Sequence, residues 1–261
     1  MAPDAPNRKQ LGLIVPSNRP GMTPDDPPFL GECREYGRWI EEQGIDWVDV
    51  LFEASFSTGS HAPDSVWQTG DLKVLIPPAR RLADAGCDAL SWPCTCASFI
   101  GGLEWSRNQV AELTRVTGLP ATSTSLAMLA AIETLGADTI DVLGPYPPAV
   151  TTALQRFLND AGIEVAAMVA LDCADDSVSI NLDLWAEAKR FDSGLPNRGH
   201  PLVIPDTAVY SLDVVGNVER ELGRPVVAAN QATVWHSLKM LGIDCHTADA
   251  GRLFRHPTSW S

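Results

Sequence analysis

The run from Ser91 to Gly102 carries the residue types best suited to chemistry. It reads SWPCTCASFIGG, follows an apolar stretch and precedes a helix-like segment. Cys94 therefore lies at a predicted turn from the carboxyl end of a strand into a helix, which is where open parallel α/β sheets bind ligands. Helix N-terminal amides bind anions, and the local dipole favours the thiolate form of a cysteine. The position predicts a reactive thiol beside a bound anion.

A second turn echoes this one later in the chain. The Pro-Cys-Thr sequence around Cys94 returns as Pro-Asp-Thr around Asp206, and each turn follows a short apolar run. Each is followed by a helix, a short proline-containing segment and a helix that ends in Leu-Gly. Two similar halves would place Cys94 and Asp206 at matching points, so that a thiol and a carboxylate flank one cleft. The alternative is that two strand–turn–helix units share these features by chance.

Three further side chains could take part in binding or catalysis. Tyr146 lies in a Gly-Pro-Tyr-Pro turn after a predicted strand, where it would either donate its hydroxyl to an anion or simply pack. His61 lies in a stretch rich in Ser and Gly, so we expect a solvated loop histidine. His236 lies inside a predicted helix, so we expect a structural role. Because no histidine neighbours Cys94 in the sequence, hydrolysis through a thioester lacks an obvious base.

Strands and helices alternate along the chain, which predicts an α/β fold with parallel sheets. The predicted strands are residues 11–16, 47–52, 87–92, 120–122, 138–143, 164–169, 202–204 and 226–229. The predicted helices are residues 29–43, 71–85, 97–117, 124–135, 148–161, 182–191, 210–222 and 231–241. Asp71 is the expected cap of the second helix, and Pro77-Pro78 are expected to interrupt it. Residues 20–28, 53–70 and 171–181 are predicted loops around the substrate pocket.

The bulk properties limit the class of protein. A length of 261 residues allows one large or two small domains, and we divide it into residues 1–120 and 121–229, with a C-terminal helix within 230–261 packing back on the first half. A net charge of −14 argues against nucleic acid as a partner. No segment resembles a secretory signal or a membrane span. Six cysteines in such a chain make no disulfide framework, so a cytoplasmic location is expected.

The same sequence argues against common cofactors. Cys94 and Cys96 are unaccompanied by a second cysteine pair or a histidine cluster, so they do not form a zinc site. The glycine-rich patterns that bind nucleotide phosphates are absent. The acidic segment around Asp176 lacks the spacing of a calcium-binding EF-hand, so a solvated loop is expected there.

Several motifs together resemble the maleate isomerase and arylmalonate decarboxylase branch of the aspartate/glutamate racemase superfamily. They are the first strand with Ser17-Asn18, the run from Cys94 to Gly102, the Tyr146 turn, Leu222–Val227 and Gly251–Leu253. The resemblance implies two Rossmann-like halves related by pseudo-twofold symmetry, with an active-site cleft between them. It also implies no cofactor, no metal and a homodimer or larger homo-oligomer.

The sequence departs from that branch at three positions. Asp206 stands where the branch usually has its second cysteine, and Cys94 matches the first. Asp176 stands where an asparagine is expected, and a Ser-Ser-Asn sequence is shortened to Ser17-Asn18. The resemblance implies that the asparagine and the Ser-Ser-Asn sequence hold substrate carboxylates, so the changes at Asp176 and at Ser17-Asn18 bear on the choice of substrate.

The resemblance implies an isomerase of maleate-isomerase type acting on a small carboxylate. Cys94 would add to the substrate double bond, and Asp206 would act as the opposed acid or base. Ser17, Asn18, Thr95, Cys96, Tyr146 and Thr207 are the expected substrate-binding residues. The alternatives are a racemase, lyase or decarboxylase with the same site, or a non-catalytic carboxylate-binding protein.

Overall fold

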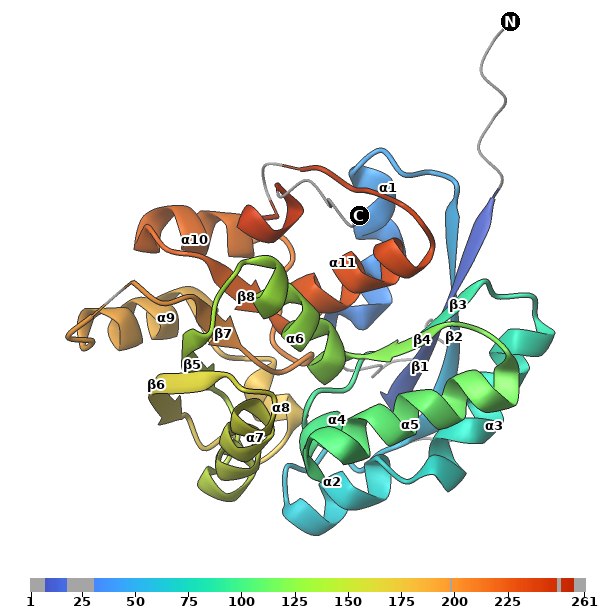
Figure 1. Ribbon diagram of the computed structural model, residues 1–261, viewed down its shortest axis with the longest axis horizontal. Helices are drawn as coiled ribbons and strands as arrows, with labels where there is room; N and C mark the ends of the chain where they lie inside the picture. Colours follow the sequence, from blue (N-terminus) through green and yellow to red (C-terminus); the bar gives the residue numbers. More distant parts are fainter. Residues whose placement is uncertain (1–7, 18–30, 198, 248–249, 256–261) are drawn as a thin grey trace, which may run out of the picture.

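The computed structural model describes residues 8–17, 31–197, 199–247 and 250–255, and its strands form two parallel sheets (Figure 1). The first sheet has the order β2-β1-β3-β4 and contains β1 (Lys9–Ser17), β2 (Val48–Phe56), β3 (Ala89–Trp92) and β4 (Ala121–Ser123). Its helical segments are η1 (Glu32–Glu35), α1 (Tyr36–Glu42), α2 (Pro63–Thr69), α3 (Leu72–Asp84), α4 (Cys96–Phe99) and α5 (Gly102–Thr117). Every residue of β3 is buried, as expected for a central parallel strand covered by helices on both faces.

The second sheet repeats this arrangement with the order β6-β5-β7-β8. Its strands are β5 (Thr139–Gly144), β6 (Glu164–Ala170), β7 (Leu202–Ile204) and β8 (Val226–Ala228). The helices of this part are α6 (Thr124–Thr134), α7 (Pro148–Asp160), α8 (Asp176–Ser179), α9 (Leu184–Ser193) and α10 (Val215–Leu222). The strands of both sheets follow the same spatial order, so the predicted α/β fold with two similar halves is confirmed.

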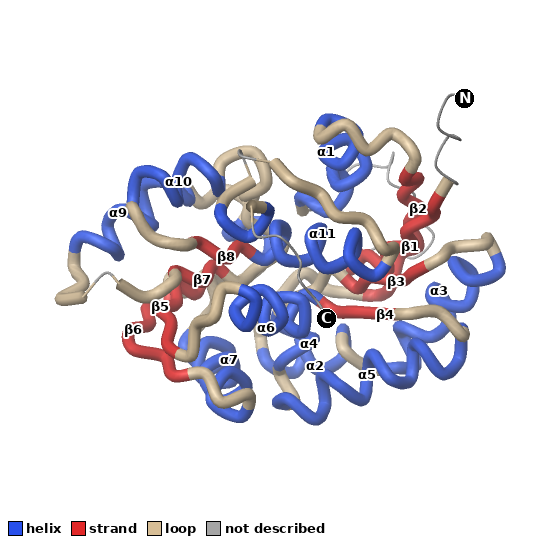
Figure 2. Tube along the Cα trace, turned by 45° about the horizontal axis from the view of Figure 1, so that its top comes forward, coloured by secondary structure: helices blue, strands red, loops and turns tan. Residues whose placement is uncertain are grey.

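Two helices, α6 and α11 (Ala229–Met240), connect the sheets, since each of them contacts both β4 and β8. α11 packs against α6 and contacts β3, β4 and β8, and η2 (Arg252–Phe254) follows it (Figure 2). Thr124 and Thr233 share a hydrogen bond of 2.9 Å between their hydroxyls at this contact. Because β4 pairs with β3, the first sheet continues past residue 120. The division of the chain into domains stays a prediction.

Local backbone requirements account for two differences from the predicted helices. Residues 97–117 form two helices, because Gly102 has a φ of 86°, which a continuous helix cannot accommodate. Residues 53–70 are not one loop, because β2 extends to Phe56 and α2 begins with Pro63 at its first position, where a proline loses no hydrogen bond. These differences leave two short helices near the Cys94 turn, since α4 begins two residues after Cys94 and α2 packs against α4.

Other differences concern helix ends and prolines. The Asp71 cap is confirmed, since its carboxylate accepts a 2.9 Å hydrogen bond from the amide of Lys73. Pro77 and Pro78 lie inside α3 and do not interrupt it, and the buried face with Leu75 continues through them. The predicted helix 29–43 is η1 followed by α1 over its described part, α8 occupies part of the predicted loop 171–181, and α10 begins at Val215 rather than 210.

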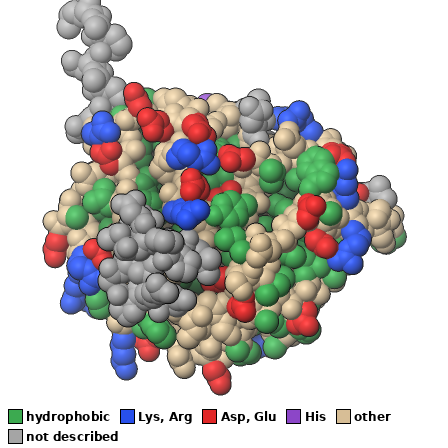
Figure 3. Space-filling model, turned by 180° about the vertical axis from the view of Figure 1, so that it is seen from behind, with side chains coloured by type: hydrophobic (Ala, Val, Ile, Leu, Met, Phe, Trp, Pro, Cys, Tyr) green, Lys and Arg blue, Asp and Glu red, His purple; other side chains and the backbone are tan. Residues whose placement is uncertain are grey.

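The chain has a net charge of −14, and its basic residues are not clustered on the face shown in Figure 3. On that face the described Lys and Arg side chains are scattered among Asp and Glu and form no continuous stripe. No helix among the described residues is long and apolar enough to cross a membrane.

A buried glutamate ties the two halves together next to the Asp206 turn. The Glu32 carboxylate is only 3% exposed and accepts hydrogen bonds from the amides of Ser211 and Leu212 at 2.8–2.9 Å, and from the Ser211 hydroxyl at 3.1 Å. Burial raises the pKa of Glu32 to about 7, and the hydrogen bonds from Ser211 and Leu212 oppose this rise. One side chain from the first half therefore fixes the segment that follows Asp206.

Glu32→Ala should destabilise the protein by about 2–4 kcal/mol, because it leaves two backbone amides buried without an acceptor. The measurement is the free energy of unfolding in urea. Glu41→Ala, which removes an exposed glutamate from the neighbouring helix, is the matched control and should change stability by less than about 0.5 kcal/mol. Equal effects of the two substitutions would show that Glu32 does not tie the halves.

Candidate active site

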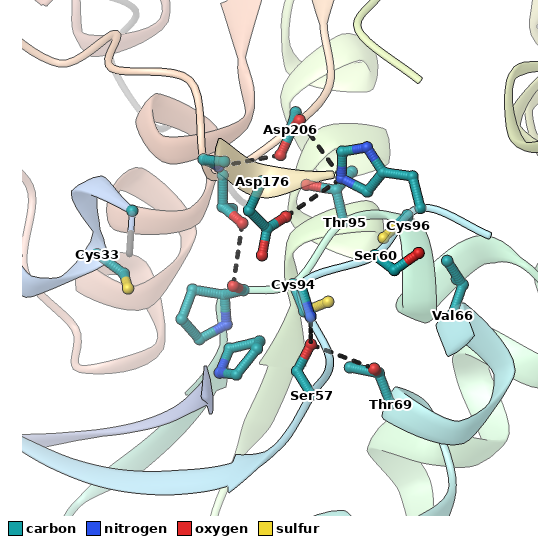
Figure 4. Close-up of a pocket in the computed structure, with 17 residues that line it drawn as sticks. Cys33, Ser57, Ser60, Val66, Thr69, Cys94, Thr95, Cys96, Asp176 and Asp206 are labelled. Carbon is teal, nitrogen blue, oxygen red and sulfur yellow. Dashed lines mark hydrogen bonds and ion pairs between the residues drawn. The ribbon is translucent and has the colours of Figure 1, made fainter. Parts of the chain in front are cut away.

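The Cys94 turn is fixed by β3 and α4. β3 ends at Trp92, the Cys94 amide donates a 2.8 Å hydrogen bond to the Trp92 carbonyl, and α4 begins at Cys96. Cys94 is 6% exposed and lines a cavity together with Thr95 and Cys96 (Figure 4). The sequence places the thiol at a strand end, and the fold turns that strand end into the wall of a cavity.

The Asp206 turn lies on the opposite side of the same cavity. Asp206 follows β7, is 5% exposed and has a φ of 133°, a strained conformation that non-glycine residues seldom adopt. Its Oδ1 atom accepts a 2.9 Å hydrogen bond from the amide of Ala208. Among the described residues, its Oδ2 atom has no hydrogen-bond partner. One carboxylate oxygen therefore holds the turn, and the other is left for the cavity.

A direct hydrogen bond joins the two turns. The Thr207 hydroxyl donates to the carbonyl of Pro93 at 3.1 Å, although 114 residues separate them in the chain. Cys94 and Asp206 thus lie across one cavity from each other, as the repeated tripeptide predicts. Their chemical roles stay predictions at this point.

His61 is the residue that the sequence analysis misjudged, because the expected solvated histidine is 1% exposed. Its Nδ1 atom lies 2.8 Å from the carbonyl of Cys173, and its Nε2 atom lies 3.2 Å from Oδ1 of Asp176 and 3.9 Å from Oδ2 of Asp206. The isolated bridge between Ser60 and Asp175 brings the two pocket loops together at this point. The structure therefore adds a histidine and a second aspartate to the site.

These three groups set one another's protonation. Burial raises the pKa of Asp206 to about 6, against the charge of His61, which lowers it, while Asp176 raises it. For His61, burial lowers the pKa, but the hydrogen bond to Asp176 and the charges of Asp206 and Asp176 outweigh it and raise the pKa to about 9. Near neutral pH the cavity therefore contains an imidazolium between two carboxyl groups, one of which titrates close to pH 6.

The same cluster meets the simplest requirements of a cation site. His61, Asp176 and Asp206 each offer one ligand atom, and these atoms lie within 4.8 Å of one another. One nitrogen and two carboxylate oxygens suit a divalent transition metal. The short contact between His61 and Asp176 equally suits a direct ion pair, so the arrangement alone does not require a metal.

Cys96 and Cys33 are the other thiols at this cavity. Hydrogen bonding to Cys94 and burial raise the pKa of Cys96 well above its usual range, and burial raises the pKa of Cys33 to about 12. Both side chains therefore stay protonated at neutral pH. Cys96 is a thiol beside Cys94 rather than a second nucleophile.

The remaining predicted site residues divide into three groups. Thr95 and Thr207 line the cavity, and Thr95 Oγ1 is buried without a hydrogen-bond partner among the described residues. Ser17 and Tyr146 are buried but do not line it. The ring of Tyr146 packs edge to face against that of His61, with centroids 4.9 Å apart and planes at 87°, and burial raises the pKa of its hydroxyl well above the usual range. Asn18 lies outside the described residues.

The predicted structural role of His236 fits its surroundings. Its Nδ1 atom lies 2.9 Å from the Thr122 hydroxyl, and burial lowers its pKa to about 4. The ring belongs to the contact between α11 and β4, and it is not part of the cavity.

Comparison with known proteins places the chain in a family. A family model described as arylmalonate decarboxylase matches residues 69–254. The chain belongs to the arylmalonate decarboxylase family. A maleate isomerase of Geobacillus stearothermophilus is 30% identical over 256 residues, which cover 94% of this chain and 96% of its own. An arylmalonate decarboxylase of Bordetella bronchiseptica is 25% identical over 94% of this chain and 95% of its own.

Solved structures of the family agree with the fold. A cysteine-to-serine variant of Nocardia farcinica maleate cis-trans isomerase, with a covalently bound succinylcysteine intermediate, superimposes with a TM-score of 0.83. It is 18% identical and covers 97% of this chain and 100% of its own. At this identity the likeness shows the fold alone. The predicted resemblance to the branch that contains maleate isomerases and arylmalonate decarboxylase is confirmed, and the chain belongs to a family of enzymes.

Iodoacetamide should label Cys94 before Cys96, because the raised pKa of Cys96 keeps that side chain a thiol. Peptide mass spectrometry at neutral pH measures the order of labelling. Cys94→Ala should abolish labelling at this site and activity with it, whereas Cys96→Ser should keep activity within about tenfold, since a hydroxyl remains to donate to Cys94. Faster labelling of Cys96 would reverse the two roles.

Proposed function

We propose that the protein is a cofactor-independent isomerase of the maleate-isomerase type, which acts on a small unsaturated carboxylate through a nucleophilic Cys94. The observation that carries the proposal is the placement of Cys94 across a buried cavity from Asp206, whose pKa is raised to about 6. The maleate isomerase of Geobacillus stearothermophilus supports the reaction type. A succinylcysteine intermediate in the Nocardia farcinica enzyme supports covalent chemistry at a cysteine.

The proposed reaction consists of addition, rotation and elimination. The Cys94 sulfur bonds to one alkene carbon, and the displaced π electron pair takes a proton from Asp206 at the other carbon. The former double bond is now single and rotates. The Asp206 carboxylate then removes a proton from the same carbon, the double bond re-forms in the trans arrangement, and the carbon–sulfur bond breaks to release the thiolate.

The neighbouring groups fit this sequence. Thr95 and the amide of Cys96 lie beside Cys94 and would take up negative charge as it develops on the substrate. The imidazolium of His61 would stabilise Asp206 each time it loses its proton, through the 3.9 Å approach of Nε2 to Oδ2. Thr207 would act mainly through its hydrogen bond to Pro93, which holds the two turns together.

A decarboxylase or lyase with the same site is the second candidate, because the matching family model is described as arylmalonate decarboxylase. In that reaction Cys94 would protonate the carbanion that remains after carbon dioxide leaves. A covalent Cys94 adduct, seen by intact mass after incubation with an unsaturated acid, would favour the isomerase. A cytoplasmic location and a homo-oligomeric assembly remain predictions from the sequence.

Asp206→Asn should slow turnover by about 10²–10⁴-fold, the usual contribution of a general acid–base group. The substitution keeps the oxygen that accepts from Ala208, so the strained turn should be preserved while the titration is lost. In the wild type, kcat should fall as pH rises through about 6, because the proton donor is then ionised. The variant should not show this fall of kcat with pH. The measurement is NMR of the cis-to-trans conversion of maleate, and of its monoamide, across the pH range.

Asp213→Asn is the matched control, since Asp213 lies on the same segment with its side chain 62% exposed. This substitution should leave both kcat and its fall with rising pH unchanged. If Asp206→Asn turns over like the wild type, Asp206 serves only to shape the turn, and the chemistry rests on Cys94.

A further inference from the structure

The charges around the cavity are arranged on one side. Among the described residues that line it, the charged side chains are those of Asp176, Asp206 and His61. Figure 4 shows the two carboxylates on one side of Cys94, with one Asp176 oxygen directed toward His61 and the other toward the Cys94 turn. The described part of the lining contains no Lys or Arg.

His61, the one cationic group in the described part of the lining, has no hydrogen bond left for a substrate. His61 uses Nδ1 for the carbonyl of Cys173 at 2.8 Å and Nε2 for Asp176 at 3.2 Å. Its positive charge is therefore shared by two carboxylates that already surround it. A substrate carboxylate placed at this end would meet the charge of Asp176, the charge of Asp206 whenever that group has lost its proton, and no free N–H of the imidazole.

The same end instead offers acceptors. Asp206 is 5% exposed, and its Oδ2 atom has no hydrogen-bond partner among the described residues. A buried carboxylate oxygen without a donor is costly unless a ligand supplies one. A group with N–H donors, such as a carboxamide, would satisfy it.

The opposite side of Cys94 has the reverse preference. The Ser57 hydroxyl oxygen accepts from the amide of Gly59 at 3.1 Å, and it lies 3.4 Å from the Thr69 hydroxyl, which donates to the Ser65 carbonyl at 3.0 Å. Ser57 and Thr69 are both uncharged hydroxyl side chains. Figure 4 shows Ser57 and Thr69 on the side of Cys94 away from Asp176 and Asp206. Because the described lining on this side carries no negative charge, a substrate carboxylate is better placed here than beside Asp176 and Asp206.

We propose that the preferred substrate is an unsaturated monocarboxylate whose second end is an uncharged N–H donor, a carboxamide, rather than a dicarboxylate such as maleate. The proposal rests on the proposed isomerase function and names its substrate class. The carboxylate lies toward Ser57, the carboxamide toward Asp176 and Asp206, and the double bond lies at Cys94. Maleamate, the monoamide of maleate, is the simplest molecule of this kind.

The wild type should convert maleamate with a kcat/KM about 100-fold or more above that for maleate, because like charges placed together at a binding site are strongly disfavoured. Asp176→Asn removes one of those charges and keeps the shape. It should raise kcat/KM for maleate about tenfold or more and change that for maleamate less, so the ratio of the two falls. NMR of the cis and trans products measures both rates in each variant.

Asp172→Asn is the matched control. Asp172 belongs to the same loop, is exposed, and has a φ of 59°, a conformation that asparagine adopts readily. It removes the same charge outside the cavity, so the ratio should stay that of the wild type. The proposal is overturned if the wild type prefers maleate, or if Asp176→Asn and Asp172→Asn give the same ratio.

A binding experiment separates this proposal from the proposed reaction. Succinamate and succinate, the saturated counterparts, cannot isomerise, and each is tested for protection of Cys94 against iodoacetamide. Stronger protection by succinamate supports the substrate class even if neither unsaturated acid turns over, in which case the isomerase function fails alone. Equal protection, or stronger protection by succinate, overturns the substrate class. Repeating the assay after chelation shows whether a bound cation at His61, Asp176 and Asp206 reverses the preference, which would also overturn it.

Discussion

The contact between His61 and two carboxyl groups controls the chemistry available in this cavity. A buried carboxylate loses its hydration, so it either binds a proton or needs a positive partner. His61 is that partner, and the carbonyl of Cys173 holds its ring in place through Nδ1. The imidazolium limits the rise in the pKa of Asp206 to about 6, which is close enough to neutral pH for the group to both give and take a proton.

The surrounding fold holds this contact and Cys94 in fixed positions relative to each other. β3 and β7 are equivalent strands of two equivalent sheets, and their carboxyl ends deliver the two turns. Thr207 and Glu32 then cross between the halves and fix the segment around Asp206, whose backbone is strained. Strain of this kind persists only where neighbouring contacts over-determine the conformation. The hydrogen bonds of Thr207, Ala208, Ser211 and Leu212, all in the segment that follows Asp206, supply that constraint.

Sequence patterns predicted the parts of the site that depend on local order. Alternating strands and helices, together with the repeated tripeptide, placed Cys94 and Asp206 at matching strand ends, and the structure brings them to one cavity. The burial of His61 could not be predicted in this way, because it depends on contacts with residues 112 and 115 positions away in a second loop. Both loops follow strand carboxyl ends, which was the available signal. Tyr146 shows the converse, since its turn was predicted correctly but its ring packs against His61 and does not line the cavity.

An aspartate at position 206 makes sense only together with His61 and Asp176. A carboxylate at this position without the imidazolium would face Asp176 in a buried cavity, and removing one partner of a buried ion pair typically costs about 3–5 kcal/mol. An imidazolium without Asp206 would be paired with Asp176 alone and would add positive charge where a second substrate carboxylate could bind. The three residues are therefore coupled energetically, and the effects of changing them one at a time should not add. In the proposed reaction Asp206 transfers the proton, Asp176 contributes the charge that the substrate meets, and His61 makes both carboxyl groups compatible with burial.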